Sequence, residues 1–496
     1  MDELSAAELD ELSDAIGLPV DDAEMDDLVA TVATLREDLD EVDALPTAGT
    51  VSVSERRWSP PESNPYNAVS RWCDVPPTAD HSGELSGVEV GLKEIIAVAG
   101  VPMECGSGAM AGYVPRRDAT VVDRLREAGA TVTATLALDE FAGSASGTTG
   151  VDGPIRNPHD PDRTAGGSSG GSAVAVATDD VDVALGTDTG GSVRIPASFC
   201  GVVGLKPSYG LVPLTGVGEN TYTLDHVGTF ADSVETTARV LDVLAGRGEA
   251  DPASLQAAGR AGYRVGNYEE AAGTGSVGEV TVGVLEEGFG DGVSAAVADH
   301  TRATVDGLDA EGVAVESVSV EHFAAGRAVK NLLSLTELAT LWRDGGVPYR
   351  RASVVDDGYR AGFAARSRAS GRRLSTWYKS KLLAGAALVE RDHGLRYGRA
   401  QAARDLLARE VADALDGVDC LLLPTMPETA PHLDDAPSPD FDYARNTRLA
   451  NVTRVPAITL PNGTVDGLPV GLQLVAGEFE ERTLLRVASH LEPRLG

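Results

Sequence analysis

The sequence is short of cysteine and of long apolar runs, and each shortage excludes a class of protein. Its four cysteines lie far apart without a Cys-x-x-Cys pair, which is too few for a disulfide framework and lacks zinc-ligand spacing. No apolar run reaches the roughly 18 residues of a membrane span, and the acidic start, MDELSAAELDELSD, is no signal peptide. We therefore expect a cytoplasmic protein without a metal site. The cysteines are Cys73, Cys105, Cys200 and Cys420.

Positive charge is also scarce. The chain has 41 Lys and Arg residues, only five of them lysine, and 76 Asp and Glu residues, so its net charge is −35. The electrostatic field of this negative charge repels phosphates and anionic lipids. We therefore expect no direct contact with nucleic acid and none with a membrane. A solvated acidic surface suits high salt, which screens the repulsion between its charges. A halophilic source is therefore a hypothesis.

What the sequence does contain is a helical leader followed by an alternation of strands and helices. Leu, Ile and Val recur at near-helical spacing up to about residue 45, and residues 46–65, with four prolines, read as a linker. We predict an N-terminal helical segment with its linker over 1–65 and one domain over 66–496.

Within that domain, apolar runs predict strands and amphipathic runs predict helices. The alternation predicts an α/β fold whose central sheet is mixed, largely parallel and flanked by helices on both faces. The expected strands lie within 88–100, 181–191, 418–424 and 456–461, and the expected helices within 119–132, 172–180, 231–246 and 400–415.

Two Gly-Ser clusters carry the strongest chemical signal. They are AGGSSGGSAVAVA (165–177) and LGTDTGGSVRIPASFCGVVGLKP (185–207), which place Ser168 and Ser192 24 residues apart. A serine becomes a nucleophile only when a base takes its proton. No histidine adjoins either cluster, but Lys93 lies between apolar stretches, and burial would lower its pKa enough for a base. The turn Asp188–Ser192 offers N–H groups for an oxyanion.

Three other interpretations of the clusters stay open at this point. A phosphate-binding loop needs GxxxxGK[ST], and no lysine follows these glycines. Residues 166–170 match the GxSxG nucleophile elbow, which needs a strand before it and a later histidine such as His226. The clusters could also be structural turns.

Five segments together resemble the amidase signature family, over nearly the whole chain after residue 65. They are GLKEIIAVAGVP, DEFAGS (139–144), GGSSGGSA, GTDTGGSVRIPASFCGVVGLKP and GLPVGLQLV (467–475). The resemblance implies a Ser-Ser-Lys relay: Ser192 as nucleophile, Ser168 on a cis peptide bond as the bridge, and Lys93 as base. It also implies an oxyanion hole from the backbone of Thr189, Gly190 and Gly191, supported by Asp188 and Arg194. Glu94 stands where the family usually has Asp.

Two subfamilies fit the resemblance. Stretches such as NPYNAVSRW (64–72) and LEEGFGDGVS (285–294) are more similar to stand-alone amidases, whose helical leaders dimerise, than to the A subunit of the tRNA-dependent amidotransferase. We therefore expect an amidase that releases an acid and ammonia from a small amide without a cofactor, with a homodimer through the leader. The glutaminase A subunit is the alternative. We expect the acyl pocket to draw on residues 103–113, 215–225 and 330–400.

Overall fold

The computed structural model falls into two compact units, residues 1–52 and 53–496. It describes residues 5–16, 18, 20, 21, 23–30, 41, 56–78, 83–273, 280–346, 357–436, 438 and 441–495. In the first unit, α1 (Ala6–Ile16) and residues 23–30 are helical, as the apolar spacing predicts. In the second, β1 (Arg57–Ser59) comes from the proposed linker and pairs with β2 (Val69–Val75). The division at residue 65 stays a prediction.

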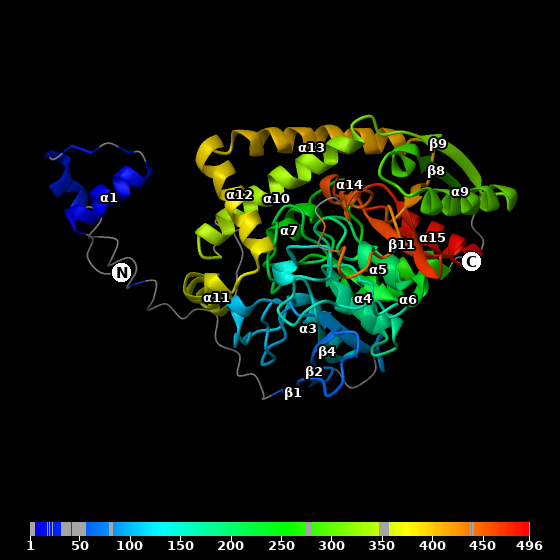
Figure 1. Ribbon diagram of the computed structural model, residues 1–496, viewed down its shortest axis with the longest axis horizontal. Helices are drawn as coiled ribbons and strands as arrows, with labels where there is room; N and C mark the ends of the chain where they lie inside the picture. Colours follow the sequence, from blue (N-terminus) through cyan, green and yellow to red (C-terminus); the bar gives the residue numbers. More distant parts are fainter. Residues whose placement is uncertain are drawn as a thin grey trace. The chain divides into compact units, whose positions relative to one another are not determined.

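A single twelve-stranded sheet organises the second unit (Figure 1). Its strands lie in the order β1-β2-β4-β3-β5-β7-β6-β11-β12-β10-β8-β9. The remaining strands are β2 (Val69–Val75), β3 (Glu89–Lys93), β4 (Thr131–Leu136), β5 (Val183–Thr187), β6 (Val203–Lys206), β7 (Val227–Ala231), β8 (Thr281–Leu285), β9 (Ala314–Val318), β10 (Cys420–Pro424), β11 (Ala457–Val465) and β12 (Leu468–Val475).

The mixed sheet is confirmed, but the expectation that it is largely parallel is wrong. Among the described strands, four pairings are parallel, at β3–β4, β3–β5, β8–β9 and β8–β10. The other seven are antiparallel. The crossover helices allow parallel pairs on the two flanks. The centre instead contains the short β11–β12 hairpin and the antiparallel β6–β7 pair, which the apolar runs did not distinguish.

Helices cover both faces of the sheet. Ala184 packs with the apolar side chains of α4 (Gly170–Ala177). Its neighbours Val183 and Leu185 pack in the core that contains α3 (Thr120–Glu127) and α6 (Val234–Leu244). A strand buried on both faces reads as a continuous apolar run, as VALGT does. The helices are α3 (Thr120–Glu127), α4 (Gly170–Ala177), α5 (Arg194–Cys200), α6 (Val234–Leu244), α7 (Pro252–Ala258), α8 (Tyr268–Gly273), α9 (Ala295–Ala310), α10 (Gly326–Arg343), α11 (Asp357–Ser370), α12 (Thr376–Asp392), α13 (Leu395–Ala414), α14 (Arg448–Val452) and α15 (Glu481–Leu491).

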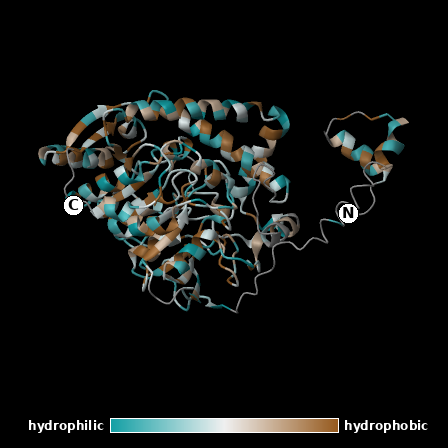
Figure 2. Cartoon of the chain, turned by 180° about the vertical axis from the view of Figure 1, so that it is seen from behind, coloured by the Kyte–Doolittle hydropathy of each residue, from teal (hydrophilic) through white to brown (hydrophobic). Residues whose placement is uncertain are grey.

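Helices α3, α6 and α15 are amphipathic, and α6 and α9 each start at a serine cap. The hydroxyls of Ser233 and Ser294 accept the N–H groups three residues on, at the starts of α6 and α9. Figure 2 shows hydrophobic and hydrophilic residues alternating along these helices, which fits one face toward the core and one toward solvent. Within the described chain, no helix has both the length and the apolar character to cross a bilayer.

Two parallel strands determine where the chemistry gathers. In β3 and β5, Leu92 pairs with Leu185, so both strands end at the same edge of the sheet. The last residue of β3 is Lys93, and the last of β5 is Thr187. The turn Asp188–Ser192 follows β5 directly.

Candidate active site

Lys93 lies between the two Gly-Ser clusters. Its Nζ lies 2.7 Å from Ser168 Oγ and 2.7 Å from Thr187 Oγ1, and it donates to both. Lys93 and Ser168 have no exposed surface. The sequence predicted the approach of Lys93 to Ser168, but it gave no role to Thr187, which fixes the lysine from its other side.

Burial lowers the pKa of the Lys93 ammonium to about 7, from its usual 10.5, although the Asp139 and Asp188 carboxylates partly offset the effect. About half of the lysines are therefore neutral near pH 7. A neutral Lys93 can accept the Ser168 hydroxyl proton over the same 2.7 Å contact. The lysine thus has the position and the basicity of a general base.

Ser168 is placed by a tightly packed loop before α4. The Gly167–Ser168 peptide bond is cis. A Cβ on Gly167 would lie 2.0 Å from Asp139 Oδ2, so only glycine fits there. Asp139 in turn accepts the N–H groups of Gly147 and Thr149. The loop is therefore held from several sides, and the Ser168 hydroxyl faces Lys93.

Ser192 ends the turn Asp188–Ser192 in the second cluster, close to the first cluster. The Ser169 N–H donates to the Ser192 carbonyl at 3.2 Å, which links the two clusters through their backbones. Ser192 is 7% exposed and lines a cavity of about 410 Å³. It is thus the serine of the pair that a substrate can reach.

The turn before Ser192 depends on glycine and on a side-chain brace. Gly191 has φ +134, and a Cβ there would lie 2.1 Å from Thr447 Oγ1. The Gly191 N–H donates to Asp188 Oδ1 at 2.7 Å, and the Thr447 hydroxyl donates to the Gly190 carbonyl at 2.7 Å. In this structure the Gly191 N–H is engaged within the turn, which leaves Thr189 and Gly190 as the candidate oxyanion donors of the predicted set.

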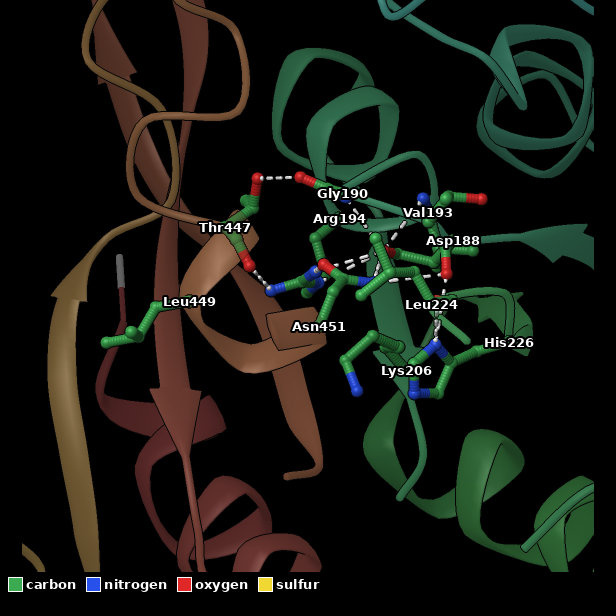
Figure 3. A network of polar contacts seen from close by, with 12 residues as sticks. Asp188, Gly190, Val193, Arg194, Lys206, Leu224, His226, Thr447, Leu449 and Asn451 are labelled. Carbon is green, nitrogen blue, oxygen red and sulfur yellow. Dashed lines mark hydrogen bonds and ion pairs between the residues drawn. The ribbon is translucent and has the colours of Figure 1, made fainter. Parts of the chain in front are cut away.

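Asp188 and Arg194 form a fully buried ion pair that holds the turn against the C-terminal part of the chain (Figure 3). Burial alone would raise the pKa of Asp188, but the Arg194 guanidinium holds that pKa well below its usual range. Arg194 also donates to the Thr447 carbonyl at 2.8 Å, Asn451 Oδ1 at 2.7 Å and Gln473 Oε1 at 2.8 Å. Together with the ion pair, these hydrogen bonds of Arg194 restrain the turn Asp188–Ser192.

The cavity at Ser192 is built from segments far apart in sequence. The predicted ranges 215–225 and 330–400 contribute Asn220, Lys330 and Lys381. The prediction that residues 103–113 line it is wrong, because this segment packs in the core through Met103 and Met110. Residues 142–146 and 441–444, which the sequence analysis did not assign to the pocket, line it instead.

Two residues weighed in the sequence lie outside the relay. Glu94 Oε1 accepts the Glu104 N–H at 3.2 Å, and burial raises the pKa of Glu94 to about 8. The Glu94 carboxylate therefore accepts a hydrogen bond from the Glu104 backbone rather than from either serine. His226 Nδ1 donates to the carbonyls of Leu224 and Asp188, so it braces the turn backbone (Figure 3). Ser168 contacts a lysine rather than this histidine, against the nucleophile-elbow interpretation.

Comparison with known proteins identifies one family. The family described as Amidase matches residues 74–485. The A subunit of the glutamyl-tRNA(Gln) amidotransferase of Halobacterium salinarum is 39% identical over 415 residues, covering 83% of this chain and 96% of the relative. The protein of the same name from Haloarcula marismortui is 41% identical over 420 residues, covering 82% and 96%.

Solved structures give the same result. The peptide amidase of Stenotrophomonas maltophilia superposes with a TM-score of 0.70 at 31% identity, over 83% of both chains. The A subunit of the glutamyl-tRNA(Gln) amidotransferase of Thermotoga maritima gives 0.69 at 31% identity, over 83% of this chain and 84% of that one. With a buried Ser-Lys contact at the end of β3 and relatives over most of its length, this chain belongs to the amidase signature family and is a hydrolase of amide C–N bonds.

Proposed function

We propose that this chain hydrolyses a carboxylic amide to the acid and ammonia through an acyl-enzyme on Ser192. The observation that carries the proposal is the buried contact of 2.7 Å between Lys93 Nζ and Ser168 Oγ, beside a turn that presents Ser192 to a cavity. A lysine without exposed surface and with a pKa of about 7 is suited to proton transfer.

The relay runs from Ser192 through Ser168 to Lys93. Neutral Lys93 accepts the Ser168 proton while Ser168 takes the proton of Ser192, whose Oγ bonds to the amide carbon. The proton returns through Ser168 to the nitrogen as the C–N bond breaks, and ammonia leaves. Water then attacks the ester carbon, gives its proton to the same relay, and releases the acid.

Charge on the carbonyl oxygen is stabilised by the turn. The N–H groups of Thr189 and Gly190 are the donors we assign to it, while the Gly191 N–H serves only if it leaves Asp188. Asp188 and Arg194 are positioning residues, since their ion pair fixes the backbone that presents these donors.

The test is ammonia release by two variants and a matched control. Ser192→Ala and Lys93→Met should each lower kcat/KM by at least about 10³-fold, because members of one relay act as a unit. Ser172→Ala removes a buried hydroxyl that donates to the Leu185 carbonyl, outside the relay. It should keep most of the rate. A Ser192→Ala enzyme as active as Ser172→Ala would refute the assignment.

A second candidate is the glutaminase A subunit of a tRNA-dependent amidotransferase. The names of the relatives at 39% and 41% identity favour it over the stand-alone amidase that the sequence motifs favoured. Turnover of acetamide, benzamide or a 2-arylpropionamide by the purified chain would support a stand-alone amidase and leave a homodimer through the leader to be tested by its mass in solution. Ammonia from glutamine alone, or only after partner subunits are added, would support the glutaminase.

A further inference from the structure

The cavity at Ser192 is positively charged in a protein that is strongly acidic. Four basic side chains line it, and among the described lining residues they face one acid, Asp442. The net charge of the whole chain is −35, so this concentration of positive charge runs against the composition. The basic residues are Arg327, Lys330, Lys381 and Arg448.

Three of these four cations either contact a neighbouring group of the protein or are exposed to solvent. Arg448 is paired with Asp442. Lys381 donates to the Gly143 carbonyl and lies over the Trp377 ring at 5.2 Å. Arg327 is exposed. None of the three needs a ligand to satisfy its charge.

Lys330 is different. It is carried by α10, which packs against α12, and its side chain reaches the turn that carries the nucleophile. A Cβ on Gly190, two residues before Ser192, would lie 3.2 Å from Lys330 Cε and 3.9 Å from its Nζ. Within the part of the chain that the structure describes, this ammonium has no hydrogen bond and no ion pair. A partly buried, unpaired cation is costly to a fold, and a ligand that paired with it would remove that cost.

We propose, building on the amide hydrolysis above, that Lys330 binds a carboxylate on the acyl part of the substrate. The preferred substrates are then amides that also bear an acid group a few bonds from the scissile carbonyl. An ammonium gives such an anion a charge-assisted hydrogen bond, and it selects against neutral amides of the same shape.

The electrostatics of Lys330 agree with this role. Burial, then the neighbouring Lys381 and Arg448, lowers the pKa of Lys330 to about 7, while Asp225 acts in the opposite direction. A bound carboxylate would favour the charged form and so restore the ammonium that binds it.

Three ligands of nearly one shape separate the possibilities. Glutaramide is neutral, glutaramate replaces one amide by a carboxylate, and glutamine adds an α-ammonium beside that carboxylate. We expect kcat/KM for glutaramate or glutamine to exceed that for glutaramide by about tenfold to a hundredfold, the value of one charge-assisted contact. Glutaramate as the better substrate identifies simple amic acids as the source of the carboxylate, and glutamine as the better substrate identifies the amino acid.

Lys330→Met removes the charge and keeps the apolar stem. It should lower kcat/KM for the acid-bearing amide about tenfold or more, mainly through KM, and leave glutaramide within about twofold. Lys379→Met removes the same charge from α12, where Lys379 donates to the Arg372 carbonyl outside the cavity. This control should change neither substrate.

Binding to the Ser192→Ala enzyme tests the same point without turnover. Glutaramate or glutamine should raise its unfolding temperature more than glutaramide does, and the difference should vanish when Lys330→Met is added. Equal binding of charged and neutral ligands, or equal losses on both in Lys330→Met, would overturn the inference while leaving the relay intact. Failure of the relay itself appears separately, as full activity in Ser192→Ala.

Discussion

Four of the five lysines are buried or line the cavity, and that placement underlies the proposed chemistry. Lys93 and Lys206 have no exposed surface, and Lys330 and Lys381 line the cavity. Positive charge at the surface is left almost entirely to arginine. Burial lowers the pKa of a lysine into the physiological range, whereas arginine stays charged. The interior lysines are therefore the cations that can give up a proton.

The pH profile should report Lys93. With its pKa at about 7 in place of 10.5, the neutral fraction rises from about one in eleven at pH 6 to about one half at pH 7. For a neutral amide, kcat/KM should therefore rise tenfold per unit at low pH and level off above about pH 7. A neutral substrate is essential, because Lys330 also titrates near pH 7. A rate independent of pH between 5 and 9 would exclude Lys93 as the base.

We propose that Thr187, which the sequence did not reveal, is a positioning residue for Lys93. Its hydroxyl accepts a hydrogen bond from Lys93 at 2.7 Å, which favours the charged form of the lysine. Thr187→Val keeps the side-chain shape and removes that acceptor, so the pKa of Lys93 should fall further. For a neutral amide, the rise of kcat/KM with pH should begin at lower pH. Its plateau value should fall about tenfold, because the lysine is less well held. If kcat/KM of Thr187→Val rises at the same pH as in the unchanged enzyme, Thr187 contributes only packing.

At the scale of elements, the Asp188–Arg194 pair connects four parts of the chain. Asp188 follows β5, Arg194 begins α5, and the guanidinium also bonds to side chains of α14 and β12. Asp188→Asn would leave a buried guanidinium without its counter-charge, which should cost about 3–5 kcal/mol of unfolding free energy. The drop should appear in urea unfolding, since urea does not screen charge.

The matched control is a pair at the surface. Glu286→Gln removes the partner of Arg302, where both side chains are nearly half exposed, and should cost less than about 1 kcal/mol. Asp188→Asn should also lose amidase activity, because the catalytic turn loses its brace. Similar unfolding midpoints for the two variants would show that the buried pair contributes no more than an exposed one.

Local sequence patterns predicted which segments form strands and helices better than they predicted which strands lie next to one another. The apolar runs within 181–191 and 418–424 form β5 and β10, because a strand covered on both faces needs apolar side chains throughout. Which strands pair antiparallel depends on contacts between distant segments, and the expectation of a largely parallel sheet failed there.

The candidate site shows the same difference between local signals and contacts of distant segments. Ser168, Ser192 and Lys93 were identifiable because their local motifs are unusual. The cavity was identifiable only in part, through the ranges 215–225 and 330–400, because α10, α12 and the described residues 436, 438 and 441–448 meet only in the fold. Lys330 in particular lies in an ordinary helical run, VKNLLSL, and only its position beside Gly190 distinguishes it.

At the scale of the whole molecule, few of the acidic residues that the structure describes are buried. Of the 76 Asp and Glu residues in the sequence, the described chain buries seven: Glu94, Asp139, Glu140, Asp188, Asp225, Asp251 and Glu481. All seven accept hydrogen bonds from neighbouring groups. The remaining acids contribute to a net charge of −35 that the arginines do not balance.

That surplus predicts a salt dependence of stability. Added salt shortens the range of repulsion from about 10 Å at 0.1 M to about 3 Å at 1 M, so the folded state, which holds the charges closest together, gains more than the unfolded chain. The thermal unfolding midpoint should rise with KCl, with most of the gain below about 1 M, and NaCl should act equally if screening is the cause. A midpoint that stays flat or falls with either salt would show that the acidic surface does not limit stability, and the hypothesis of a halophilic protein would lose its physical basis.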